Sequence, residues 1–153
     1  MANSQAHREA RITIDLLPHR VVLEQMRSHE RLSEPYLIEV YVVCEDGEVD
    51  FLPFLGRPVG IEVRDDDEVM LRHFHGLLFE AAFVGWDTSG YRYRLILKPW
   101  LHLLRQNLTY RIFQDRTAVE VIKEVLDASR VSDVDYSRLS GSFRKRKYCV
   151  QYR

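Results

Sequence analysis

The stretch that decides the fold is Tyr91–Leu126, YRYRLILKPWLHLLRQNLTYRIFQDRTAVEVIKEVL. Its hydrophobic period changes several times within one uninterrupted run. In residues 91–98 aromatic and apolar side chains alternate with basic ones, which predicts a half-buried strand. Pro99 lacks a backbone donor and disfavours helical geometry at the residue before it, so the strand ends there and a short helix over 99–104 begins. The alternation returns at 108–113, which predicts a second strand.

The end of this stretch carries a helix start signal. Thr117 is followed three residues later by Glu120, the spacing of a capping box in which each side chain bonds to the backbone amide of the other residue. Behind the cap, apolar residues recur at helical spacing on one face and charged residues occupy the opposite face. The apolar face consists of Ala118, Val121, Ile122, Val125 and Leu126. We predict an amphipathic helix of about three turns.

Segments with β character lie on both sides of this stretch. They are residues 12–16, 21–27, 36–43, 59–64, 69–86 and 148–153. The segment 21–27 is also compatible with a helix, whereas 36–43 is almost entirely apolar and suits a strand covered on both faces. Gly76 interrupts the long segment 69–86 and indicates a bulge or a sharp bend. Residues 51–55 are compatible with a short helical turn or a hydrophobic plug.

Short antiparallel segments at hairpin spacing, with little helix between them, define the fold class. We predict an α+β protein, mostly antiparallel β, with a strongly curved sheet or small barrel and one or two helices. Regular alternation of strands and helices is absent, which argues against a doubly wound parallel sheet.

Composition limits the classes of function. A chain of 153 residues with 46% apolar residues fits one domain with an ordinary core. The net charge of −1 provides no general attraction to nucleic acid or anionic membranes. Residues 1–10 are polar and predict a disordered leader, and no apolar run is long enough for a signal peptide or a membrane span. The two cysteines, Cys44 and Cys149, form no Cys-x-x-Cys pair and are predicted to be reduced.

Candidate metal ligands have simpler interpretations. His73 and His75 share one face of a strand and could bind a metal together with a third group. No further cluster completes such a site, so we interpret them as partly exposed residues on either side of a buried Phe74. The acidic segments 45–50 and 65–68 lack the ligand spacing of an EF-hand and are interpreted as solvated turns. No metal or other cofactor is predicted.

No catalytic motif is evident. There is no Gly-x-Ser-x-Gly elbow and no glycine-rich phosphate loop, and the serines of segment 140–142 lie in a polar loop. We therefore predict that the chain is not an enzyme and has no catalytic residues. The basic run 144–147 beside Tyr148 could contact nucleic acid or an acidic partner, but a solvated strand edge is the favoured interpretation. The aromatic residues are assigned mainly to the core, with some at a subunit interface.

Four patches, in the same order, resemble the amino-terminal region of the VgrG spike proteins of bacterial type VI secretion systems, which are similar to the hubs of contractile phage tails. The patches are LSEPYLIEV, FHGLLFE, LKPWLHLLRQNLTYRIFQDRTAVEVIKEVL and RKYCVQYR. The resemblance covers residues 11–153 and assigns them to the amino-terminal part of a phage-tail-hub-like domain. Because the family's hub continues well beyond this region, the resemblance implies a fragment of a longer protein or a short family member.

The resemblance also implies a function. It predicts a structural component of the puncturing spike: a homotrimeric hub that sits on the hexameric tube protein Hcp, carries a needle with a PAAR-repeat tip, and connects to the baseplate and effectors. Such a protein would be made in the cytoplasm and exported by the secretion machine. The alternative is a stand-alone small β-barrel module that binds a peptide or glycan. The residues tied to the resemblance, with a structural packing role, are Phe74, His75, Gly76, Pro99, Trp100, Leu101, Ile112, Phe113, Gln114, Asp115, Tyr148, Gln151 and Tyr152.

Overall fold

The chain forms two compact units in a computed structural model, residues 1–102 and residues 103–153. We call them the sheet unit and the ribbon unit and describe each by itself. The structure describes residues 10–15, 17, 20–45, 47–65, 67, 69–106, 109–129 and 134–152. Apart from Ala10, which opens the first strand, the predicted leader lies outside the described residues.

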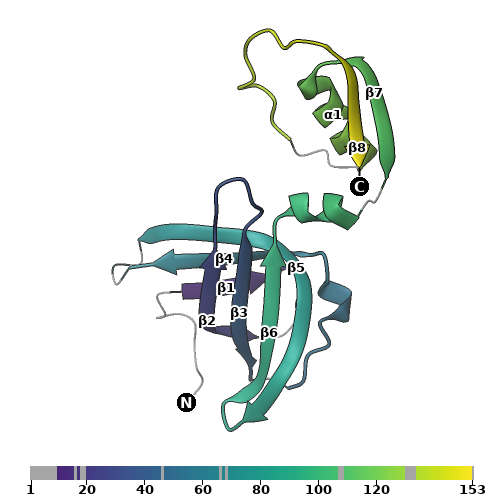
Figure 1. The fold of residues 1–153 in the computed structure, drawn as a ribbon. Coiled ribbons are helices and arrows are strands. Elements are labelled where there is room, and N and C mark those ends of the chain that lie inside the picture. The colour runs from purple at the N-terminus through teal and green to yellow at the C-terminus, as the bar shows by residue number, and fades with distance from the viewer. Residues whose placement is uncertain are drawn as a thin grey trace. The chain divides into compact units, whose positions relative to one another are not determined.

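The sheet unit is built on one six-stranded antiparallel sheet (Figure 1). Its spatial order is β1-β4-β5-β6-β3-β2, and the two edge strands approach each other, so the sheet curls into a half-barrel. The strands are β1 Ala10–Ile14, β2 Val21–His29, β3 Leu37–Cys44, β4 Pro58–Arg64, β5 Met70–Asp87 and β6 Gly90–Lys98. The predicted α+β fold with a strongly curved antiparallel sheet is confirmed, and the ambiguous segment 21–27 lies in a strand.

The longest strand, β5, joins the two halves of the sheet. Its first part pairs with β4 and its second part with β6, and Leu77 lies opposite both Pro58 and Lys98. Of the two alternatives predicted at Gly76, a bulge or a sharp bend, the bulge is not observed there, because the β5–β6 register shifts between residues 78 and 80 and again between 83 and 85. At Gly76 the glycine instead allows β5 and β6 to approach each other closely. A Cβ at this position would lie 3.2 Å from both the Leu97 Cβ and the Lys98 carbonyl oxygen.

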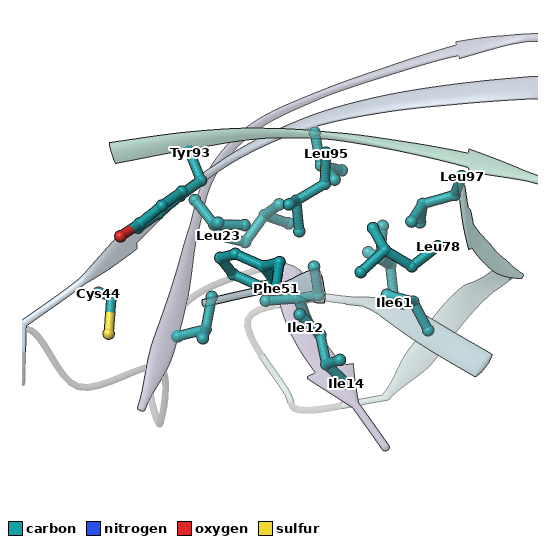
Figure 2. Close-up of a cluster of buried hydrophobic side chains, with 14 of the residues drawn as sticks. Ile12, Ile14, Leu23, Cys44, Phe51, Ile61, Leu78, Tyr93, Leu95 and Leu97 are labelled. Carbon is teal, nitrogen blue, oxygen red and sulfur yellow. The ribbon is translucent and has the colours of Figure 1, made fainter. Parts of the chain in front are cut away.

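The core of the sheet unit fills the concave side of the curved sheet (Figure 2). Alternate apolar residues of all six strands contribute, and Phe51 inserts among them from the loop after β3. Its ring contacts Tyr93 edge-on, with 4.9 Å between centroids, and the Val49 amide donates a 2.7 Å hydrogen bond to the Tyr93 hydroxyl oxygen. The predicted plug is therefore present, followed by the short 3₁₀ helix η2 Leu52–Phe54.

Strand β3 departs from its prediction. Ile38, Val40 and Val42 are buried on one face. On the other face Glu39 and Tyr41 are half-buried and Val43 is buried, so this second face is covered only in part. There Glu39 forms an ion pair with Arg94 of the neighbouring strand, with 3.4 Å between nitrogen and oxygen. The apolar run suggested two buried faces because Leu and Tyr also occupy partly exposed positions of a curved sheet.

The ribbon unit consists of a two-stranded antiparallel ribbon and one helix. Its elements are β7 Tyr110–Arg116, α1 Ala118–Ala128 and β8 Arg146–Tyr152. The 3₁₀ helix η3 Trp100–Gln106 spans the boundary between the units in the sequence and replaces the short helix predicted at 99–104. Helix α1 contacts β7, and the buried Phe113 and half-buried Cys149 form a cross-strand pair on the covered face of the ribbon.

The predicted capping box is confirmed at the start of α1. The Thr117 hydroxyl accepts from the Glu120 amide at 3.2 Å, and the Thr117 amide donates to the Glu120 carboxylate at 2.7 Å. Two amides that the first helical turn would leave unpaired are thereby satisfied. The cap also fixes where β7 ends and α1 begins.

Replacing Thr117 with alanine removes the hydroxyl acceptor. We expect the substitution to lower the free energy of opening of α1 by about 1 kcal/mol. Amide hydrogen exchange of the α1 residues measures this opening locally, without depending on the sheet unit. Thr88→Ala, in an exposed turn of the sheet unit, is the matched control. Equal α1 exchange rates in the two variants would contradict the proposed role of the cap.

Acid should weaken the same cap. The hydrogen bonds to the backbone and side chain of Thr117 lower the pKa of Glu120 from its ordinary value of 4.5. Because the folded pKa lies below the unfolded one, the contribution is complete above about pH 4.5 and is lost as the pH falls through the folded pKa. We expect the Thr117 amide proton shift in NMR to titrate with a midpoint below 4.5. The titration should vanish in Glu120→Gln, and an unchanged titration there would rule out this assignment.

Substitution of Gly76 tests the close approach of β5 and β6. Gly76→Ala places its methyl group against the Leu97 Cβ and the Lys98 backbone, and we expect the sheet unit to lose about 1 to 3 kcal/mol of stability. Gly60→Ala is the control, because its new Cβ meets only the ring tip of His73 at 3.3 Å, which can move. Urea unfolding followed by tryptophan fluorescence measures both, since both tryptophans belong to the sheet unit. Equal losses of stability in Gly76→Ala and Gly60→Ala would contradict a close approach of β5 and β6 at Gly76.

Candidate functional site

The residues considered for metal binding and catalysis do not form a site in the described part of the chain. His73 and His75 are exposed, Phe74 between them is half-buried, and no three His, Cys, Asp or Glu side chains of the described residues could hold a metal ion. Cys44 is buried and Cys149 half-buried, and no disulfide joins them. None of the described helices combines the length and the hydropathy needed to cross a membrane. The predicted acidic turns fall partly on residues outside the described ranges.

A groove lies on the sheet unit beside the Phe51 plug. It encloses about 580 Å³, and its lining includes Phe51, Leu52, Leu55, Phe83 and Tyr93. Two carboxylates, Glu48 and Asp50, also border it. We call it the acidic groove. Its inner wall is buried aromatic core, whereas Leu52 is 72% exposed and Phe83 54% exposed, so apolar surface is open to solvent here.

The geometry of the acidic groove follows from the loop that carries the plug. Because Phe51 is drawn into the core, the adjoining Leu52 is left on the outside, at the start of η2. The Asp50 carboxylate accepts from the Leu52 amide at 2.9 Å and holds this turn. Among the lining residues from the strands, the Phe83 ring meets the Tyr93 ring edge-on at 5.6 Å between centroids. Burial raises the pKa of the Tyr93 hydroxyl, although the hydrogen bond that it accepts from the Val49 amide acts in the opposite direction.

The outer face of the ribbon is a second exposed apolar surface. The pairs Tyr110–Tyr152 and Ile112–Val150 lie opposite each other across the two strands, and Tyr148 follows opposite Gln114. All five apolar residues are exposed, the three tyrosines by 67 to 75%. We call these five residues the ribbon face. Helix α1 covers the opposite face, so the described part of the chain leaves this sheet surface uncovered.

Cross-strand ion pairs run over the outside of the curved sheet. The Arg92 guanidinium binds both Glu24 of β2 and Asp87 at the end of β5. Its hydrogen bond lowers the pKa of Asp87, and the two carboxylates raise the pKa of Arg92. Arg72 of β5 binds Glu30 just after β2, with 2.7 Å between nitrogen and oxygen. Water screens exposed pairs of this kind, so they fix strand positions more than they stabilise the fold.

The residues tied to the resemblance fall into two groups. Phe74, Gly76, Pro99, Trp100, Phe113 and Gln151 are buried or half-buried, whereas His75, Leu101, Ile112, Gln114, Asp115, Tyr148 and Tyr152 are exposed. The Gln151 amide oxygen is shielded without a hydrogen-bond partner in the described part of the chain. Three of the exposed residues belong to the ribbon face. The packing role of the whole set stays a prediction.

The sequence analysis predicted neither the ribbon face nor the acidic groove. The alternation in 108–113 and 148–153 was visible, but it does not say which face a helix covers. The acidic groove combines a loop with two strands that pair only in the folded chain. A signal for it was present in the sequence, since two leucines and two phenylalanines follow a run of acidic residues at 45–50.

An open apolar ribbon face and a second apolar groove are typical of a protein that contacts other proteins. Comparison with known protein families identifies the family of this chain. Residues 29–153 match the model of the phage tail baseplate hub (GPD) family, and the chain belongs to that family.

Similar proteins support the same assignment. The chain is 32% identical over its whole length to the type VI secretion system spike protein VgrG1b of Pseudomonas aeruginosa, and 29% identical over 97% of its length to VgrG1a of the same organism. It spans about a fifth of the length of these curated relatives, 20% and 23%. The predicted resemblance to VgrG proteins is confirmed.

A solved structure has the same fold. It is the Escherichia coli c3393 protein, described as a component of the type VI secretion system with structural similarity to the T4 bacteriophage tail proteins gp27 and gp5. The TM-score is 0.76 at 17% sequence identity, over 93% of this chain and 39% of that chain.

Proposed function

We propose that the chain is a structural part of the puncturing spike of a type VI secretion system. The observation that carries the proposal is the match of residues 29–153 to the phage tail baseplate hub family. The spike proteins VgrG1b and VgrG1a align with nearly the whole chain, which supports a role in the same machine. The exposed ribbon face and acidic groove fit a protein that works through contacts with other subunits.

The proposal extends to the assembly. Three copies form a hub that sits on the hexameric tube protein Hcp and carries a needle, a PAAR-repeat tip and effectors, with the baseplate around it. The protein is assembled in the cytoplasm and leaves the cell with the spike. Mechanical rigidity and self-complementary surfaces, rather than catalysis, provide its function.

Light scattering over a concentration series tests the assembly. We expect the purified chain to reach the mass of a trimer as the concentration rises. A chimera in which this chain replaces the matching amino-terminal region of VgrG1b addresses the role directly. We expect it to be trimeric and to restore export of the tube protein in cells that lack their own VgrG1b.

The control chimera carries Phe113→Asp, which puts a charge into the buried side of the ribbon and should abolish export. A well-folded chimera that remains monomeric would contradict the spike proposal. That result would favour the alternative of a peptide-binding barrel module, for which the acidic groove is the candidate site.

A further inference from the structure

The ribbon unit carries a basic segment that continues directly into its exposed apolar face. Residues 144–147 are Arg, Lys, Arg and Lys, and all four are exposed. Tyr148 follows at once and begins the β8 part of the ribbon face. An apolar, aromatic surface with a cluster of positive charge at one end suits a partner surface that is apolar with negative charge at its edge.

The acidic groove of the sheet unit has that composition. Leu52, Leu55 and Phe83 provide exposed apolar surface, and Glu48 and Asp50 are also among the lining residues. No ion pair within the described ranges engages Glu48. Asp50 uses one carboxylate oxygen for the Leu52 amide. The groove volume of about 580 Å³ is enough for an aromatic side chain and the residues beside it.

The exposed area of the ribbon face is large enough for a stable contact. Its three tyrosines are 67 to 75% exposed and leave roughly 400 Å² of side-chain surface uncovered, given about 200 Å² for each ring residue. Stable interfaces bury about 800 Å² on each partner, so the tyrosines alone supply about half of that amount. Ile112, Val150 and the basic segment add to it.

We propose that the acidic groove of one copy receives the ribbon face of a second copy of this chain, with Tyr148 in the groove and the basic segment 144–147 against Glu48. The proposal rests on the trimeric hub proposed above and identifies the interface that builds it. Two different surfaces then meet at each contact. Such a heterologous contact generates a closed ring when the rotation from one copy to the next adds up to a full turn. A contact between two identical surfaces stops at a dimer.

The charges argue for this pairing over a symmetric one. Two acidic grooves facing each other would bring the Glu48 and Asp50 carboxylates of both copies together without compensating charge. The pairing of groove with ribbon instead places opposite charges at the edge of an apolar contact. Tyr148 is also an amphipathic anchor of the kind that dominates interface energies, because its ring is apolar and its hydroxyl remains wet.

A charge swap tests the pairing. Glu48→Lys and Arg146→Glu each place like charges at the contact, and we expect each to raise the dissociation constant of the oligomer about tenfold or more. The two substitutions combined in one chain should restore association to within about threefold of the original chain, since the charges are opposite again. Sedimentation velocity over a concentration series measures all four proteins.

Matched controls separate the contact from the change in net charge. Glu124→Lys on α1 and Arg138→Glu in the loop before β8 reverse exposed charges outside both surfaces and should leave the dissociation constant unchanged. Tyr148→Ser removes the aromatic anchor and should also weaken association about tenfold, whereas Ile122→Ser, an exposed apolar position on α1, should not. Circular dichroism confirms that each variant is folded.

The outcomes distinguish this inference from the proposed function. An oligomer that is insensitive to Glu48→Lys and Arg146→Glu would overturn the pairing and leave the spike proposal intact. A double variant no better associated than the single variants would also overturn it. A chain that is monomeric at all concentrations contradicts the pairing, whereas the VgrG1b chimera decides the spike proposal separately. Cross-links between isotopically light and heavy copies, joining β8 to η2, are the expected direct signature.

Discussion

The sheet unit depends on one constraint, which is that a single strand of 18 residues must pair with a different neighbour at each end. Strand β5 meets β4 over its first half and β6 over its second, so the sheet turns where the partners change. At that turn β6 comes so close to Gly76 that a Cβ there would lie only 3.2 Å from the Leu97 Cβ and the Lys98 carbonyl oxygen. The curl that follows gives the sheet a concave side, and the core of apolar residues in Figure 2 occupies it.

The same curl creates the acidic groove. A half-barrel is open at its side, and the loop after β3 fills part of the opening with Phe51. Phe51 is buried at the end of this loop, whereas the adjoining Leu52, at the start of η2, is left exposed. The interaction that closes the core therefore leaves apolar surface beside it. The carboxylates of the same loop give that surface its charge.

The ribbon unit presents the complementary situation. Two strands and one helix can bury only one face of the ribbon, and α1 with its capping box covers the face that contains Phe113. Two-stranded ribbons are marginal alone, so their stability depends on such a cover. The other face keeps its aromatic residues in solvent. An exposed apolar face of this kind is typical of a surface that contacts another protein.

Local patterns in the sequence determined most elements. Thr117 and Glu120 specified where α1 begins, and alternation located the strands, because caps and side-chain period are set by residues within one or two turns of each other. Four quoted patches were enough to indicate the family. Only the tertiary structure decided that β5 changes partners at Leu77, that Gly76 serves a close approach, and that Tyr148 lies on the uncovered face. These features depend on which distant strands pair and which face a helix covers, and side-chain period along one segment carries no information about either.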